Sequence, residues 1–364
     1  MKRIAFLFFT LAHFIAFSSA QTQVSNFIPG VTRQGVNYFL PQTALHITVV
    51  AEKTVITPGE LNKYAFRFLR MQDVPSEAST TWKIKEITIE PYGVPDSKKA
   101  YSILVKNKTV APLVSLTRSG ILLAINTEEA ETSLQTPPQS VPAPPILNPK
   151  QFLSQEILSA GSSAKMAELC AQEIYDIRES RNALVRGEAD NTPKDGMQLK
   201  LMLDQLETQT QAIEQLFSGT TQVSTEVFTF DYLPTKETDK EVLFRFSQFT
   251  GAVANDDLSG SPIYISVKNT GNLSPRQEQP ENNTKKKFSF LPFVKNKVEN
   301  GIRYNMPAQE KITIFDVNRK YLETTCNMGQ FGYTEILSDA LFNKKSTIKV
   351  HFHQDNGGVK KLEQ

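Results

Sequence analysis

The sequence predicts an α+β protein with two mostly antiparallel β domains, which flank a proline-rich linker and a long antiparallel helical hairpin. Three observations support this fold class. Alternating and β-branched apolar residues recur in residues 21–130 and again in residues 220–364, as in antiparallel sheets. Residues 151–219 carry the periodicity of amphipathic helices. Six prolines are concentrated in residues 131–150, so this stretch is expected to be an extended, semi-rigid spacer.

Two segments of the first β part show the two-residue periodicity of strands. Ala44–Val50 places three branched or long apolar side chains on one face. Trp82–Glu90 alternates as well, but its phase slips at Lys85 and Glu86, which indicates a β-bulge. Between them, Gly59–Leu69 has apolar residues on one helical face and is predicted to be a short helix.

The helical hairpin has the clearest local signals in the chain. The apolar stripe of the first helix runs from about Ser163 to Arg186 and ends at Gly187. For the second helix we expect Thr192 as N-cap, with the following proline at the first helical position, and an end at Gly219. Its apolar residues alternate by four and three, as in a coiled-coil seam. The connecting loop is short, so the two helices are expected to be antiparallel neighbours.

A weak internal repeat links the two β parts. Gly35–Pro41 (GVNYFLP) resembles Gly301–Pro307 (GIRYNMP), and a strand rich in branched residues follows each segment. The match covers seven residues, so both chance and two related β domains remain open as explanations.

The first twenty residues have the pattern of a signal peptide. Lys2 and Arg3 precede an apolar run from Ile4 to Phe17, and small residues follow up to a cleavage site after Ala20. Removing these two basic residues from 40 Lys+Arg leaves 38, against 38 Asp+Glu in the whole chain. A balanced charge argues against general nucleic-acid binding. The mature chain has no second apolar stretch of membrane-spanning length, so we expect an exported protein, periplasmic or associated with the cell envelope.

The chain contains no spacing typical of a catalytic, cofactor or metal site. The zincin, nucleophile-elbow, phosphate-loop and dinucleotide-binding motifs are missing, so no cofactor is expected. His351 and His353 share a strand face and are expected to be solvated, with a metal site as the alternative. Cys170 and Cys326 are expected to be buried free thiols, with a bridge between them as the alternative.

Two surfaces are candidates for partner binding. The first helix carries many charged residues, which form either a partner surface or a solvated face with weak ion pairs. A second segment alternates basic and aromatic residues, and it either contacts lipid or polyanions or contributes phenylalanines to the core. The candidate partner surface consists of Glu168, Glu173, Asp176, Arg178, Glu179 and Arg181, and the candidate lipid or polyanion contact consists of Lys285, Lys286, Lys287, Phe288, Phe290 and Phe293.

Several stretches resemble one family of exported proteins of unknown function found in Gram-negative, gut-type anaerobes. The similarity covers nearly the whole mature chain, and the helical hairpin is its most specific part. The resemblance implies export but no reaction, substrate or cofactor. It is carried by Tyr38–Leu45 (YFLPQTAL), Pro58–Glu60 (PGE), Gly120–Asn126 (GILLAIN), Ser163–Glu168 (SAKMAE), Gln172–Arg178 (QEIYDIR) and Pro193–Gly196 (PKDG).

From these observations we expect a binding or scaffolding protein of the envelope without catalytic activity. Its partner would be an envelope protein or a glycan. The alternative is a carbohydrate-active hydrolase, which needs two acidic side chains in a cleft, or an accessory glycan-binding module with an aromatic platform.

Overall fold

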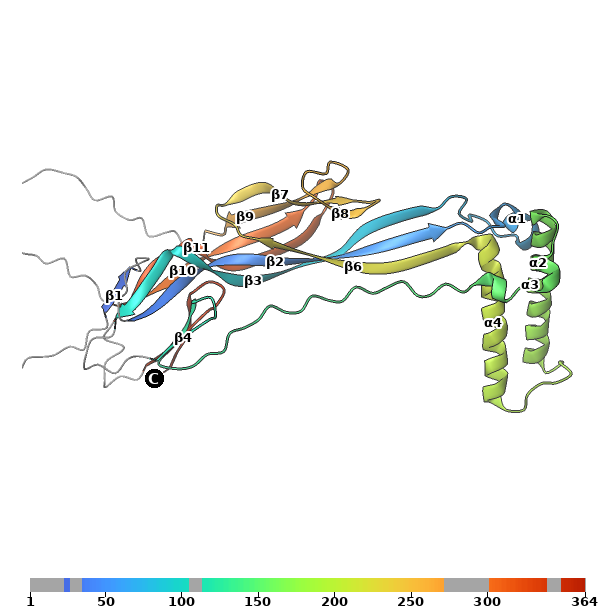
Figure 1. Ribbon diagram of the computed structural model, residues 1–364, viewed down its shortest axis with the longest axis horizontal. Coiled ribbons are helices and arrows are strands. Elements are labelled where there is room, and N and C mark those ends of the chain that lie inside the picture. The colour runs from blue at the N-terminus through green and yellow to red at the C-terminus, as the bar shows by residue number, and fades with distance from the viewer. Residues whose placement is uncertain (1–22, 27–34, 105–112, 272–300, 339–347, 364) are drawn as a thin grey trace, which may run out of the picture.

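The computed structural model describes residues 23–26, 35–104, 113–271, 301–338 and 348–363. Three antiparallel sheets form one end and the middle of an elongated molecule, and a helical pair stands at the other end (Figure 1). The α+β class, the antiparallel sheets and the helical pair are thus confirmed. The expected signal peptide lies outside the described residues. None of the described helices is long and apolar enough to cross a membrane.

The first sheet contains the two longest strands and forms the axis of the molecule. Its order is β1-β3-β2-β6, and all neighbours are antiparallel. The expected bulge in β3 is present, because Val50 pairs with Glu86 and Ala51 with Ile84, which leaves Lys85 without a partner position. The bounds are β1 Gln23–Asn26, β2 Gly35–Thr57, β3 Ser79–Leu104 and β6 Thr220–Tyr232.

The second sheet packs against the middle of the first and forms a β-sandwich. Leu45, Ile47 and Val49, which the sequence placed on one face, are fully buried in the core between these two sheets. The order of the sheet is β11-β10-β9-β7-β8. Its strands are β7 Thr238–Ser247, β8 Gly251–Val253, β9 Ser261–Asn269, β10 Gly301–Phe315 and β11 Lys320–Ser338.

The third sheet is small and closes the end of the sandwich away from the helices. It has the order β13-β12-β5-β4, and its apolar residues share a core with Tyr38, Leu40 and Ile302 of the other sheets. The strands are β4 Val114–Leu116, β5 Leu122–Ile125, β12 Lys349–Phe352 and β13 Val359–Glu363.

The strands before and after the hairpin are not segregated into separate sheets. β6 follows the hairpin in the chain and pairs with β2, which precedes it, over thirteen consecutive positions from Leu45–Tyr232 to Thr57–Thr220. β12 likewise pairs with β5. The first and third sheets thus combine strands from before and after the hairpin, whereas the second sheet contains only strands that follow it. The division into N-terminal and C-terminal β domains stays a prediction.

The two segments of the internal repeat lie against each other and have similar surroundings. The Tyr38 hydroxyl accepts a hydrogen bond from the Arg303 backbone N–H at 3.0 Å. In both hairpins four residues of the partner strand lie opposite one residue of the repeat, which is three more than regular pairing needs. Residues 96–99 of β3 lie opposite Leu40, and residues 329–332 of β11 lie opposite Pro307. This shared irregularity favours two related hairpins over a chance match.

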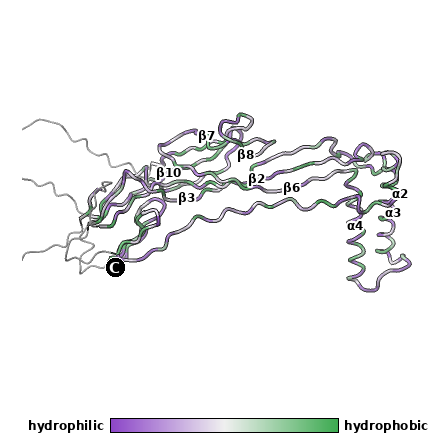
Figure 2. The backbone as a smooth tube through the Cα atoms, in the orientation of Figure 1, coloured by the Kyte–Doolittle hydropathy of each residue, from purple (hydrophilic) through white to green (hydrophobic). Residues whose placement is uncertain are grey.

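The first sheet continues beyond the sandwich as a three-stranded ribbon that leads to the helices (Figure 1). Hydrophilic and hydrophobic residues are interspersed along it in Figure 2, and most of its side chains are only half-buried. Threonines face one another across the strands, as at Thr54–Thr81 and Thr57–Thr220. Backbone hydrogen bonds and β-branched cross-strand pairs hold such a ribbon without a large core.

At the far end of the ribbon, two long and four short helices of the described chain pack around a separate core. The helix Ser163–Arg186 has the predicted bounds, with Ser162 as N-cap and Gly187 in the left-handed conformation. Cys170, Ile174, Ile213 and Phe217 are buried between the two long helices and their shorter neighbours. The bounds are η1 Asn62–Tyr64, α1 Ala65–Leu69, η2 Pro149–Gln151, α2 Gln155–Leu158, α3 Ser163–Arg186 and α4 Gly196–Ser218.

The start of α4 differs from the prediction. The N-cap is Asp195, whose carboxylate accepts a hydrogen bond from the Met197 N–H at 3.1 Å, and not Thr192. The Thr192 hydroxyl donates to the Ala189 carbonyl, so it belongs to the connecting loop. The predicted end of α4 at Gly219 is confirmed.

The proline-rich linker is docked along the ribbon. It runs from the third sheet to the helices beside β6, the edge strand of the first sheet (Figure 1). Val141 and Thr225 exchange two backbone hydrogen bonds, of 3.1 and 2.9 Å. The Gln222 amide donates to the Pro144 carbonyl at 3.2 Å. The linker thus covers part of an edge that would otherwise offer unpaired backbone groups to other chains.

Candidate functional site

The charged surface predicted on α3 is divided between ion pairs within the hairpin and exposed carboxylates. Arg178 pairs with Glu214 of α4 at 2.6 Å, and Arg181 pairs with Glu207 of α4 at 2.9 Å. These two arginines therefore fasten α3 to α4. Asp176 accepts a hydrogen bond from Gln172 at 2.8 Å, which lies on the same helix.

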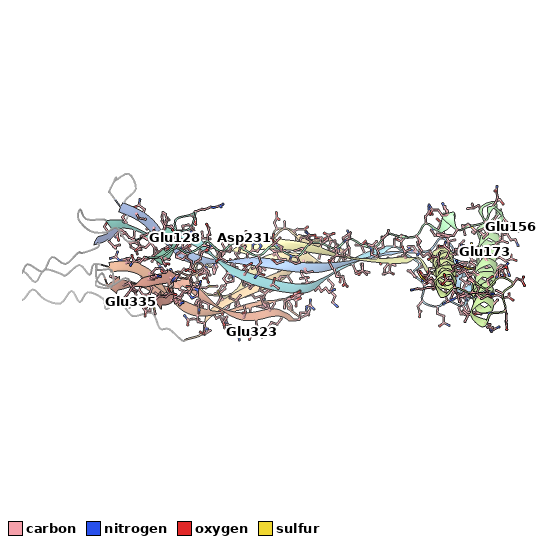
Figure 3. All side chains as sticks on the ribbon, turned by 90° about the horizontal axis from the view of Figure 1, so that it is seen from below. Glu128, Glu156, Glu173, Asp231, Glu323 and Glu335 are labelled. Atoms are coloured by element: carbon pink, nitrogen blue, oxygen red, sulfur yellow. The ribbon has the colours of Figure 1, made fainter. Side chains whose placement is uncertain are left out.

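The other acidic residues of this surface lie outward. Glu168 pairs with Lys165 one turn earlier at 3.3 Å, and Glu179 is exposed. Glu173 is half-buried and is seen with Glu156 at the helical end in Figure 3. The six predicted residues are thus brought together on one helix, but half of them serve the hairpin itself.

Four exposed apolar side chains lie at the end of the hairpin far from the ribbon and were not predicted from the sequence. Met197 is 82% exposed and Leu201 is 70% exposed, one turn apart on α4. Val185 near the end of α3 is 65% exposed, and Met202 is also exposed. The four residues Val185, Met197, Leu201 and Met202 are called the hairpin-end patch below. Met197, Leu201 and Met202 fall outside the seam of α4, and this departure from the helical pattern was the available signal.

The hairpin-end patch exists because the helices of this domain differ in length. α1 and α2 have five and four residues and cover only the part of the hairpin near the ribbon. Seam residues Leu199, Leu203 and Leu206 in the first half of α4 are only half-buried, whereas Ile213 and Phe217 near its end are fully buried. A helix pair alone cannot bury all of its apolar side chains, so this half presents apolar surface to solvent.

A groove lies where the ribbon leaves the sandwich. It has a volume of about 500 Å³ and is formed by the first residues of β3, the β7–β8 turn and the β10–β11 turn. Two apolar side chains at this groove are strongly exposed, Phe249 by 64% and Val317 by 81%. β10 ends at Phe315, so Val317 belongs to the turn between β10 and β11. An apolar residue inside a polar turn was the sequence signal for this site.

The charged side chains at the tip of β10–β11 are engaged in holding the turn. Asp316 accepts hydrogen bonds from the backbone N–H groups of Asn318 and Arg319, at 2.6 and 2.7 Å, and from the Tyr321 hydroxyl at 2.6 Å. Although burial opposes it, these hydrogen bonds lower the pKa of Asp316. The Arg319 guanidinium donates to the Ile84 carbonyl at 2.8 Å and so joins the turn to β3.

Of the two histidines expected to be solvated, His353 is exposed but His351 is half-buried, so the prediction was wrong for His351. His351 contacts the carboxylate of Glu129, which also binds Lys360 at 2.7 Å. Lys360 and His351 lower the pKa of Glu129. His353 instead lines a cavity of about 180 Å³ between the start of the linker and the β12–β13 turn. In the described part of the chain, no three His, Cys, Asp or Glu side chains are grouped as a metal site would need.

One carboxylate is buried without a counter-ion in the sandwich. Glu310 of β10 is fully buried, and Asn269 donates a hydrogen bond of 3.2 Å to one of its oxygens. The other oxygen, Oε2, has no hydrogen-bond partner. Burial and the nearby Glu237 raise the pKa of Glu310 to about 7. Of the acidic residues labelled in Figure 3, Glu156 and Glu173 lie at the helical end and the other four lie in the part of the molecule that the sheets form.

Both cysteines are free, as expected. Cys170 is buried among the helices as predicted, whereas Cys326 is only half-buried against the separate core of the sandwich. Burial raises the pKa of the Cys170 thiol to about 11 and that of Cys326 to about 12. Neither is therefore activated as a nucleophile. The predicted lipid or polyanion contact at Lys285–Phe293 lies outside the described residues.

Comparison with known protein families identifies the family of the chain. The model of a family described as a domain of unknown function, DUF4831, matches residues 34–360. No curated protein matches the chain. No solved structure matches it either.

Proposed function

This chain belongs to the DUF4831 family, a domain of unknown function, and we propose that it is an exported binding or scaffolding protein of the cell envelope without catalytic activity. Its helical hairpin would be the element that binds an envelope protein. Export is supported by the sequence of residues 1–20 alone.

The observation that carries this proposal is the placement of the hairpin-end patch. The hairpin has its own core, separate from that of the sandwich, and the half-buried ribbon holds it away from the sheets (Figure 1). The patch lies on the half of the hairpin that the shorter helices leave uncovered. Exposed apolar residues grouped on a rigid element are typical of protein-binding surfaces.

Two features support a rigid spacer rather than a flexible one. The linker runs beside β6 and forms backbone hydrogen bonds with it at Val141, so the linker and the ribbon stabilise each other. The ion pairs of Arg178 and Arg181 fasten the two long helices together. A surface that is already ordered loses less conformational entropy on binding.

Site-specific photo-crosslinking in the native host tests the proposal. A photoreactive phenylalanine analogue at Leu201 is expected to give a defined crosslinked protein. The same analogue at Leu258, an 80% exposed residue of the sandwich, serves as the matched control and should not capture that protein. The double substitution Met197→Glu and Leu201→Glu should remove capture from an analogue placed at Val185. Equal products from positions 201 and 258 would refute the proposal.

The alternative, a carbohydrate-active hydrolase or a glycan-binding module, stays a prediction. The structural feature that bears on it is the groove beside Trp82, which lies on the sandwich and is independent of the hairpin.

A further inference from the structure

The groove between β3, the β7–β8 turn and the β10–β11 turn has the features of a carbohydrate site. We propose that it binds a saccharide chain, a function separate from partner binding by the hairpin. Four features support a saccharide ligand: the volume of the groove, its exposed phenylalanine, its uncharged polar side chains and the fixed geometry of its turns.

The first requirement is a hollow large enough for sugar rings. The groove has a volume of about 500 Å³, which lies within the usual range of small-molecule sites. It is bounded on one side by Phe249 after β7 and on another by Val317 between β10 and β11. A groove open to solvent suits a chain, because the ligand can extend beyond it in either direction.

The second requirement is an apolar surface on which a sugar ring can stack. Phe249 is 64% exposed although it is a large aromatic residue. The turn does not need an aromatic side chain at this position, because a polar residue like its neighbours would form the turn equally well. Trp82 also lines the groove, but the ammonium of Lys53 lies 5.0 Å from its ring centroid and Gly251 lies close against the ring. Phe249 is therefore the ring best placed to stack on the C–H face of a pyranose.

The third requirement is a set of groups that both donate and accept hydrogen bonds, as sugar hydroxyls do. The side chains of serine, asparagine and glutamine meet it. Charged side chains contribute less to ligand binding, because Asp316 and Arg319 already form hydrogen bonds within the protein. Lys83 also lines the groove and could pair with the carboxylate of an acidic sugar. The uncharged polar residues that line the groove are Ser247, Gln248, Ser259, Ser261 and Asn318.

The turns that carry these groups have fixed shapes. The Ser247 hydroxyl accepts a hydrogen bond from the Phe249 N–H at 3.2 Å, and the Gln248 carbonyl accepts one from the Trp82 N–H at 2.8 Å. The β7–β8 turn is thereby tied to β3. Arg319 ties the β10–β11 turn to the same strand through the Ile84 carbonyl. Both walls of the groove are thus ordered before a ligand arrives, which favours affinity.

A peptide ligand fits the groove less well. Binding of an extended peptide usually adds a strand to a free sheet edge. The edge strand at the groove is β8, which has only three residues, Gly251–Val253. The lining also mixes apolar side chains with polar and charged ones, so it does not offer the uniformly apolar channel that an acyl chain would need.

The single tryptophan of the chain gives a direct test. Trp82 lines the groove, so the intrinsic tryptophan fluorescence of the full mature protein reports on this site alone. The protein is titrated with hexasaccharides of β-1,4-glucose, β-1,4-xylose, β-1,4-mannose and N-acetylglucosamine, and with an oligogalacturonate. We expect at least one of them to change the emission saturably and to protect Trp82 from acrylamide quenching.

The variant Phe249→Ala should weaken that binding by a factor of ten or more. The matched control is Phe66→Ala, which removes an equally large, 55% exposed phenylalanine from the helical end and should leave the affinity unchanged. Both variants must keep the circular dichroism spectrum of the parent. The proposal is overturned if no saccharide of the panel alters the emission, if Phe249→Ala binds as tightly as the parent, or if only a random-peptide pool protects Trp82.

Discussion

The substitution Glu310→Gln is expected to change how the stability of the sandwich depends on pH. The pKa of a glutamate is 4.5 in the absence of perturbation, and burial with Glu237 nearby raises that of Glu310 to about 7. Between these values the folded protein holds the proton while the unfolded chain has lost it. The contribution of Glu310 to stability is therefore fully present below pH 4.5 and is lost as the pH rises to about 7.

The magnitude follows from the same two values. One pKa unit corresponds to about 1.4 kcal/mol, so a shift of this size corresponds to about 3 kcal/mol at most. Glutamine keeps an oxygen that can accept the hydrogen bond of Asn269 and has no charge to bury. Glu310→Gln should therefore be close to the parent in stability at pH 5 and more stable by up to about 3 kcal/mol at pH 8.

Urea unfolding followed by Trp82 fluorescence measures this difference. Trp82 packs near the sandwich core through Phe228, so its emission follows the unfolding of the region that contains Glu310. Unfolding curves at four values between pH 5 and pH 8 are compared for the parent, Glu310→Gln and Glu77→Gln. Glu77 is exposed, so this control reports the loss of one negative charge without burial. The reasoning is refuted if the free energies of unfolding of the parent and Glu310→Gln differ by the same amount at every pH in this range.

Three further predictions concern other parts of the molecule. Gly219→Ala should destabilise the helical end by over 1 kcal/mol more than Gly187→Ala in thermal circular dichroism, because both have positive φ but only at Gly219 would a Cβ overlap the Thr57 carbonyl. A thiol reagent at pH 8 should modify both cysteines slowly in the folded protein and rapidly in urea, because burial raises the pKa of each. Glu129→Ala should speed amide hydrogen exchange in β12 and β13, since this carboxylate contacts both strands through His351 and Lys360.

Each of these has a clear opposing result. Equal melting of the two glycine variants would show that the space at Gly219 does not matter. Rapid labelling of either thiol in the folded state would contradict its burial. For Glu129→Ala, exchange in β7 serves as the internal control, and an equal change there would indicate general destabilisation.

Local features were largely predictable from the sequence. The bounds of α3, its end at Gly187, the buried face of Leu45, Ile47 and Val49, and the bulge at Lys85 were all derived from neighbouring residues. Periodicity and capping depend on residues within a turn or two, so the sequence shows them directly. The predicted N-cap of α4 was wrong because Thr192 and Asp195 are both good N-cap residues. The hydrogen bonds of the connecting loop decide between them.

The tertiary structure alone decided which distant segments meet. β6 pairs with β2 across more than 160 residues, and backbone hydrogen bonds between strands carry little sequence information about the partner. The linker lies along β6 because that strand is an edge, which no local pattern shows. The groove beside Trp82 needs three turns that come together only when both sheets have packed. The sequence thus determined the elements and their apolar faces, whereas packing of those faces determined the candidate sites.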